Sequence, residues 1–324
     1  MDIPRPPLLA CLLAAAVSRG HVIAADEPAG AGAGGKLPAA AAAFSKFPGV
    51  KAAVSGDWIL VESGGLPEHP MMEGITAWQQ QIPLPQPYRG ANAWKIPLRP
   101  SKAERPASLA DGFLRGAVAL AANGIPIFNP RNNRGEFSQD IGELDRWGGH
   151  CGRADDYHYH VIPLHLQERL GPSLPVAFAL DGYPIYGTRE PDGSPMRPLD
   201  ACGGHEDPAH GYHYHGTGRH PYVFAAFRGK VTEDGGQVDP QPRAEPVRPA
   251  GEPLRGATIL SCVRTRMDQG EGWKLDYSHA GRTLSLRWVA RETEVLLWFS
   301  GATSPVSFAR GGKGPGKPPR RQGR

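Results

Sequence analysis

Two stretches decide the fold: Gly148-Gly149-His150 with Tyr157-His158-Tyr159-His160, and Gly203-Gly204-His205 with Tyr212-His213-Tyr214-His215. The second copy follows the first at an offset of 55 residues, which maps Tyr157 onto Tyr212. The same offset maps Asp145 onto Asp200. The sequence therefore predicts an internal repeat, over residues 123–165 and 181–220.

A looser match lies upstream, where Asn123-Gly124-Ile125-Pro126-Ile127-Phe128 resembles Asp181-Gly182-Tyr183-Pro184-Ile185-Tyr186 at an offset of 58 residues. The Asn-Gly and Asp-Gly steps favour hairpin turns because these residues tolerate positive φ. Each copy is therefore expected to contain a buried strand, a tight turn, a second strand, a Gly-Gly-His loop and a His-x-His strand.

Alternation along the last strand places its paired histidines on one face, since residues i and i+2 of an extended strand point the same way. Two imidazoles on one strand face can bind one metal ion, with a further histidine coming from the Gly-Gly-His loop. Copper or zinc is the expected ion, because neutral imidazole suits both. The predicted metal ligands are His150, His158, His160, His205, His213 and His215.

The motif tyrosines should occupy the opposite, packing face of each strand. Their β-favouring side chains support the strand interpretation. Other interpretations remain open. The histidines can instead be hydrogen-bonded core or surface residues, and the six can form either one shared site or two separate sites.

Four aspartates are further candidates. Asp145 and Asp200 lie five residues before a matched histidine. They either orient the imidazoles or cap the intervening loop. Asp181 and Asp156 are weak catalytic candidates, and an Asp before Gly is more often a turn residue.

Cys151 and Cys202 flank the two Gly-Gly-His loops. A disulfide between them would staple the loops together and fits an oxidising compartment. Thiolate coordination of the metal is the rival interpretation. Cys262 would then remain as a small buried apolar residue.

The N-terminus resembles a secretory signal peptide, with Arg5 followed by the apolar run from Leu8 to Val17. This run is too short to span a bilayer, so no transmembrane segment is expected in the mature chain. A lipoprotein is not expected either, because the apolar run continues past Cys11. The protein is therefore predicted to be secreted or periplasmic. The modest net charge of +4 forms no basic stripe with interleaved aromatics, which argues against nucleic acid.

The abundant glycine and proline, 42 and 34 residues, predict many turns and little helix. The expected fold is mainly β and loop-rich, with an internally duplicated β domain and a small C-terminal antiparallel β unit. The expected segments are a signal peptide (1–25), an Ala/Gly/Pro-rich linker (26–53), the duplicated domain (54–231), a Pro-rich linker (232–256), a small β meander (257–300) and a disordered basic tail (301–324).

Several of these motifs together resemble one family. The landmarks are Asn123 to Asn129, Leu144-Asp145 with Gly148-Gly149-His150, Asp156 to His160, Leu180 to Gly187, and Gly211 to His215, with Trp78 to Pro83 upstream. Over about residues 57–229 the chain resembles the YHYH-domain family of secreted bacterial proteins. The resemblance implies an extracytoplasmic protein and brings no assigned activity.

The sequence therefore predicts a secreted metal-binding protein. A metal-dependent enzyme, either a hydrolase or a copper or iron oxidoreductase, is the alternative, as is a non-metal structural or glycan-binding β domain at a cell surface. No Gly-x-Ser-x-Gly or His-Glu-x-x-His motif occurs. The number of protein ligands separates the first two classes, because a catalytic ion keeps an open coordination position.

Overall fold

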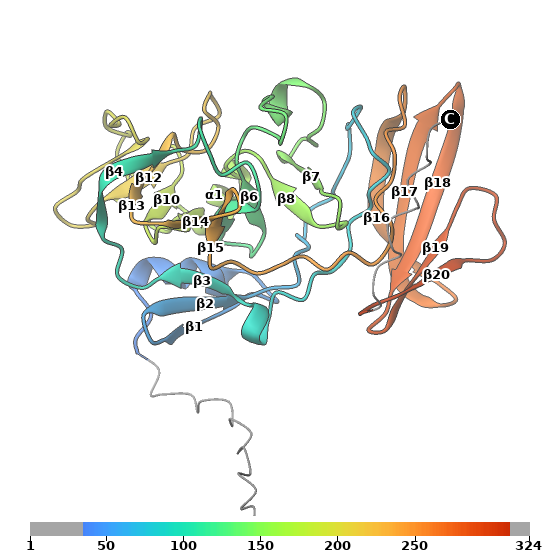
Figure 1. Cartoon of the computed structure of the whole chain (residues 1–324), viewed down its shortest axis with the longest axis horizontal. Helices are drawn as coiled ribbons and strands as arrows, with labels where there is room; N and C mark the ends of the chain where they lie inside the picture. Colours follow the sequence, from blue (N-terminus) through green and yellow to red (C-terminus); the bar gives the residue numbers. More distant parts are fainter. Residues whose placement is uncertain (1–34, 312–324) are drawn as a thin grey trace, which may run out of the picture. The chain divides into compact units, whose positions relative to one another are not determined.

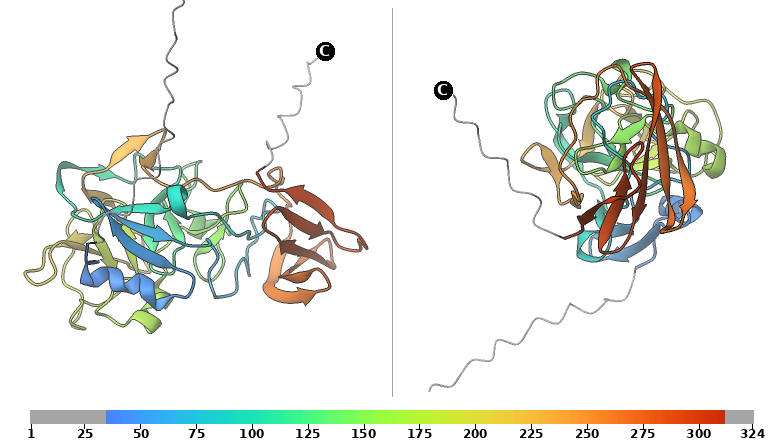
Figure 2. Two further views of the ribbon diagram at one scale, coloured as in Figure 1. Left: turned by 90° about the horizontal axis from the view of Figure 1, so that it is seen from below. Right: turned by 90° about the vertical axis from the view of Figure 1, so that its right-hand side faces the viewer.

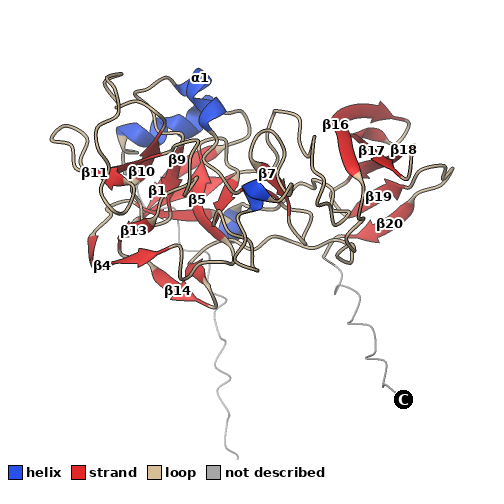
Figure 3. Cartoon of the chain, turned by 90° about the horizontal axis from the view of Figure 1, so that it is seen from above, coloured by secondary structure: helices blue, strands red, loops and turns tan. Residues whose placement is uncertain are grey.

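The computed structural model describes residues 35–311, in which strands far outnumber helices (Figure 1, Figure 3). The expected mainly β, loop-rich fold is confirmed. The helical segments are η1 (Ala39–Lys46), η2 (Gly90–Asn92), η3 (Ser138–Asp140), η4 (Leu164–Leu166) and α1 (Gln167–Leu170). Within the described residues, no helix is long and apolar enough to cross a membrane. The expected signal peptide over residues 1–25 lies outside them, as does the tail from residue 312.

An eight-stranded sheet holds both histidine strands. Its strands, in spatial order, are β11 (Gly204–His205), β12 (His213–His215), β10 (Pro184–Tyr186), β9 (Ala177–Ala179), β5 (Ala117–Ala121), β6 (Pro126–Phe128), β8 (Tyr157–Tyr159) and β7 (Gly149–Cys151). Outward from the β5–β9 pair, each half adds an antiparallel strand, then a strand parallel to that one, then an antiparallel edge strand. The two copies of the motif therefore share one strand arrangement.

The centre of this sheet is built from small apolar side chains. Every residue of β5 and of β9 is buried, as expected for strands covered on both faces. The two strands run antiparallel with Leu120 opposite Phe178. Phe178 in turn stacks on Phe44 of η1, with ring centroids 5.3 Å apart. The apolar pair thus joins the two halves and anchors η1 to the sheet.

The order of strands keeps the two histidine strands apart. Four strands, β10, β9, β5 and β6, lie between β12 and β8. Five interstrand steps of about 4.8 Å correspond to roughly 24 Å along the sheet. The six motif histidines therefore do not meet at one site.

Three smaller sheets accompany the large one. They consist of β1 (Lys51–Ser55), β2 (Trp58–Glu62) and β3 (Trp94–Pro97); of β4 (Lys102–Ser108) and β13 (Ala226–Gly229); and of β14 (Thr232–Asp234) and β15 (Gln237–Asp239). All of their strand pairs are antiparallel.

Parts of both expected linkers are ordered, which corrects the sequence interpretation. Within residues 26–53, η1 buries Ala41, Ala43 and Phe44. A run of alanines has high helix propensity, and here a buried face holds it in place. Within residues 232–256, β14 and β15 form a hairpin, and Gln241 accepts a hydrogen bond from the Ala117 amide at 2.8 Å. These segments belong to the folded domain.

The expected small C-terminal antiparallel β unit is a five-stranded sheet (Figure 2). Its strands are β16 (Thr258–Met267), β17 (Gly270–His279), β18 (Arg282–Ala290), β19 (Glu294–Trp298) and β20 (Val306–Ala309). Strand β20 pairs with β19 inside the expected disordered tail, 301–324, so this part of it is folded. The meander is hydrogen-bonded to an earlier part of the chain, where the Ile259 amide donates to Ile75 O at 3.0 Å.

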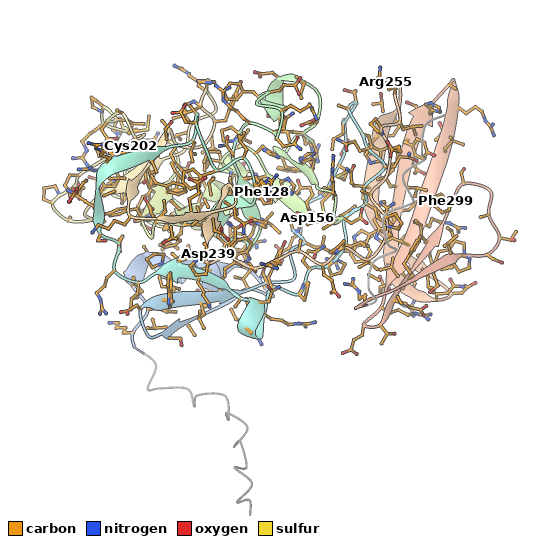
Figure 4. The ribbon with its side chains drawn as sticks, in the orientation of Figure 1. Phe128, Asp156, Cys202, Asp239, Arg255 and Phe299 are labelled. Carbon is orange, nitrogen blue, oxygen red and sulfur yellow. The ribbon has the colours of Figure 1, made fainter. Side chains whose placement is uncertain are left out.

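The expected disulfide between Cys151 and Cys202 is wrong, because Cys151, Cys202 and Cys262 are all free and buried. Cys151 lies in β7 and Cys202 two residues before β11, and these strands are the two opposite edges of the large sheet. Cys202 is labelled in Figure 4. Bridging requires Cα atoms within about 7 Å, which the strand order does not allow.

Alkylation of the denatured, unreduced protein is therefore expected to modify Cys151, Cys202 and Cys262 completely, as mass spectrometry of tryptic peptides would show. A sample reduced beforehand serves as the control and should give the same labelling. A crosslinked peptide joining Cys151 to Cys202 would contradict the strand order.

Candidate metal centres

Three histidines and a glutamate converge near one edge of the large sheet. His213 and His215 lie on one face of β12, and His205 stands opposite His213 on β11. Their ligand atoms and a carboxylate oxygen of Glu190 all lie within 4.8 Å of one another. We call His205, His213, His215 and Glu190 the β12 site.

The ligand atoms of the β12 site have the spacing of a coordination shell. The Nε2 atoms of His205 and His213 are 3.1 Å apart. Glu190 Oε2 lies 3.1, 3.5 and 3.7 Å from the Nε2 atoms of the three histidines. A tetrahedral zinc ion with ligands at 2.0–2.1 Å would have ligand-to-ligand edges of about 3.3–3.4 Å. One small ion therefore fits among these four atoms.

Backbone carbonyls fix the tautomer of each ring in the β12 site. The Nδ1 atoms donate to carbonyl oxygens at 3.0 Å for His213, 2.8 Å for His215 and 3.3 Å for His205. A carbonyl only accepts, so Nδ1 carries a proton, and in the neutral ring Nε2 then offers a lone pair. His215 Nε2 is buried and has no hydrogen-bond partner among the described residues. A metal ion would supply that partner.

Glu190 is held as a carboxylate. Burial acts to raise its pKa, but hydrogen bonds from the Arg197 amide and guanidinium, with the nearby rings of His215 and His205, outweigh burial and lower the pKa to about 2. The Arg197 amide donates to Glu190 Oε1 at 2.7 Å, which leaves Oε2 facing the imidazoles. The fourth ligand is therefore charged and oriented.

The other copy of the motif forms a second group near the opposite edge. His150 on β7 stands opposite His158 on β8, and His160 follows β8 on the same face as His158. Their ligand atoms also lie within 4.8 Å of one another, with 3.1 Å between the Nε2 atoms of His150 and His160. We call His150, His158 and His160 the β8 site.

The strand histidines of the β8 site are held like their counterparts. Nδ1 of His158 donates to Asp156 O at 2.9 Å, and Nδ1 of His160 donates to Asn129 O at 2.5 Å. The His158 ring also stacks on Phe128, with centroids 3.9 Å apart; Phe128 and Asp156 are labelled in Figure 4. The Nε2 atoms thus point to a common place in this site too.

Burial keeps most of these rings neutral. It lowers the pKa of His160 to about 3, aided by the neighbouring His158, and it lowers the pKa of His150 well below the usual value. Burial also lowers the pKa of His213 and of His215. Neutral imidazole is the form that binds metal, so these ligands need not lose a proton near pH 7.

The two sites differ in their fourth residue. At the offset of 58 residues, Glu190 corresponds to Asn132, and both carbonyls accept from the amide three residues later at 2.9 Å. Asn132 instead uses its side-chain oxygen to accept from the Arg134 amide at 2.9 Å. Sequence analysis missed Glu190, because the repeat gives no second acid to match. Glu190 is identified as a ligand only when the structure places its carboxylate beside the three histidines.

Asp145 and Asp200 form the hydrogen bonds of loop caps. Asp145 accepts from the amides of Trp147 and Gly149 and from the Tyr157 hydroxyl. Asp200 accepts in the same way from the amides of Cys202 and Gly204 and from the Tyr212 hydroxyl. The imidazole Nδ1 atoms are oriented by carbonyls instead, so the capping alternative describes these two aspartates.

Asp181 is buried among structural partners. It accepts hydrogen bonds from the Tyr214 hydroxyl at 2.5 Å and the Gly229 amide at 2.8 Å. Asp156 Oδ2 lies 3.4 Å from His158 Nδ1, beside the β8 site. The four motif tyrosines are buried, as expected for the packing face: Tyr157, Tyr159, Tyr212 and Tyr214. Among the described residues, neither Cys151 nor Cys202 joins a candidate metal group.

The Gly-Gly-His loops need their second glycine because the backbone passes against a tyrosine. A Cβ on Gly149 would lie 2.5 Å from the Tyr157 hydroxyl oxygen and 2.8 Å from His158 O. Gly149→Ala is therefore expected to lower the free energy of unfolding by about 1–3 kcal/mol, measured by urea denaturation. Gly64→Ala is the control, since a Cβ there meets nothing within 4 Å. Equal midpoints for the two variants would contradict this close contact.

The comparisons with known proteins bear on this part of the chain. The sequence model of the family described as YHYH protein matches residues 93–198. The match includes the three histidines of the β8 site and Glu190, and it ends before β11 and β12. No curated protein and no solved structure matches the chain. Residues 93–198 therefore match the YHYH protein family, which confirms the resemblance seen in the motifs.

Proposed function

We propose that this protein is a secreted or periplasmic metal-binding protein with two ion sites, one at the β12 site and one at the β8 site. One observation carries the proposal. In the β12 site three Nε2 lone pairs and one carboxylate oxygen face a common point, and each ring is fixed by a carbonyl on Nδ1. Ligating histidines in metalloproteins are typically oriented by such a hydrogen bond from the other ring nitrogen.

Without an ion, this arrangement is unfavourable. His213 Nε2 lies 3.1 Å from His205 Nε2, which also has the Arg197 guanidinium at 3.3 Å, and His215 Nε2 is buried without a partner among the described residues. An unsatisfied buried polar atom costs about 1–3 kcal/mol. Metal binding removes this cost, which supports an ion over a purely structural role for the histidines.

Zinc fits the β12 site better than copper. Three imidazole nitrogens and one carboxylate oxygen form a donor set that zinc accepts with tetrahedral geometry, whereas copper(II) prefers a tetragonal arrangement. The secreted location is supported by the sequence alone, through Arg5 and the apolar run from Leu8 to Val17.

Metal content tests the proposal directly. Protein loaded with zinc and dialysed is expected to hold two ions per chain by elemental analysis. His215→Ala and His160→Ala should each remove one ion, because each deletes one ligand from a different site. His279→Ala, which changes a histidine of β17 outside both groups, should keep two ions. Wild-type protein without stoichiometric zinc or copper would refute the proposal.

Metal removal should also lower thermal stability, because an ion that binds only the folded chain stabilises it by about 2.7 kcal/mol at one hundred times Kd. Chelation of the zinc-loaded protein is therefore expected to lower Tm by roughly 5 °C or more. The double variant with His160→Ala and His215→Ala is the control and should not respond to the chelator. An unchanged wild-type Tm would show that the ions contribute nothing to the fold.

A further inference from the structure

We propose that an ion at the β8 site keeps one coordination position open to a cationic cavity, and that this position takes a small oxyanion. The β12 site, in contrast, is closed by its own glutamate. This inference rests on the proposed metal binding and assigns different roles to the two sites.

All three histidines of the β8 site line a cavity of about 200 Å³. The volume corresponds to several water molecules at about 30 Å³ each, or to one small ion with some water. Most of the other lining residues are polar or charged, among them Arg131, Arg134, Glu143 and Arg153. The Nε2 atoms therefore face a space that solutes of this size can occupy.

No described side chain fills the fourth position. Asn132, which stands in place of Glu190, uses its side-chain oxygen to accept from the Arg134 and Glu136 amides. Glu143, the acidic residue of the cavity, accepts from Arg134 at 2.8 Å and from the Ser138 hydroxyl at 2.9 Å. Among the described His, Cys, Asp and Glu residues, only the three histidines therefore belong to the β8 site.

The positive charge of the cavity favours an anionic ligand. Three arginines and a single glutamate line it, which leaves a positive balance. The Arg131 guanidinium lies over the Phe137 ring and donates to Gly135 O, and Arg134 pairs with Glu136 and Glu143. Arg153 is exposed and forms no hydrogen bond or ion pair with another described side chain. A guanidinium with free donors next to a cation recognises oxygen anions.

The β12 site provides an internal comparison within the same chain. Its Oε2 atom already occupies the place that the oxyanion would take at the β8 site. Arg197 holds that carboxylate and also donates to Asp207 at 2.9 Å, so its charge is neutralised locally. The same strand arrangement thus presents one closed group and one open group.

Cobalt(II) spectroscopy with inorganic phosphate as the probe tests the inference. His215→Ala retains the intact β8 site, and His160→Ala retains the intact β12 site. Phosphate added to cobalt-loaded His215→Ala is expected to shift the visible d–d bands with saturation. The bands of cobalt-loaded His160→Ala should not change, because four protein ligands leave no position for phosphate.

Charge variants identify the anion's partner. Arg153→Gln, made in the His215→Ala protein, should weaken phosphate binding to the cobalt-loaded fraction by about tenfold. Arg255→Gln in the same background is the control, because Arg255 is exposed and lies outside the cavity lining. Equal phosphate affinities in these two variants would overturn the assignment of Arg153 and of the cationic cavity.

The outcomes separate this inference from the proposed function. Failure of both single-site variants to bind cobalt or zinc would refute the metal sites themselves. Stoichiometric cobalt at the β8 site with no response to phosphate would overturn only the open position. An equal response of both sites to phosphate would overturn the proposed difference between them.

Discussion

The two-residue alternation of side chains along β8 and β12 is the constraint on which both histidine groups depend. One face of each strand carries two buried tyrosines. The first of each pair, Tyr157 or Tyr212, donates to Asp145 or Asp200, and that aspartate also accepts from an amide of its Gly-Gly-His loop. The other face carries the histidines, whose Nδ1 atoms are held by carbonyls. A slip of one residue in register would exchange these faces, so packing and ligand geometry are set together.

The same strand arrangement on both sides of the β5–β9 pair holds two groups with different chemistry. The difference comes from one loop position. Glu190 supplies a carboxylate to the β12 site, whereas the side chain of Asn132, at the matching position of the other copy, accepts hydrogen bonds within its own turn. A closed group with four protein ligands is typical of a structural ion, whereas three protein ligands leave a coordination position open. The two groups thus share a common scaffold but would offer a bound ion different ligands.

Local features of this fold could be predicted from the sequence, and features that depend on strand order could not. The His-x-His geometry, the packing tyrosines and the antiparallel meander follow from short-range patterns. The six histidines do not meet because four strands lie between β8 and β12. The same strand order places Cys151 and Cys202 at opposite edges of the sheet, where they cannot form a disulfide. Glu190 and the alanine helix η1 were missed because tertiary contacts, which no local pattern encodes, give them their roles.

Anomalous diffraction from crystals of the zinc-loaded protein, recorded above and below the zinc edge, tests the central claim of two metal sites most directly. The structure predicts two peaks, roughly five strand spacings of about 4.8 Å apart. One should lie within bonding distance of Glu190 and the β12 histidines, and the other beside the three β8 histidines. A map without peaks at either group would contradict the account.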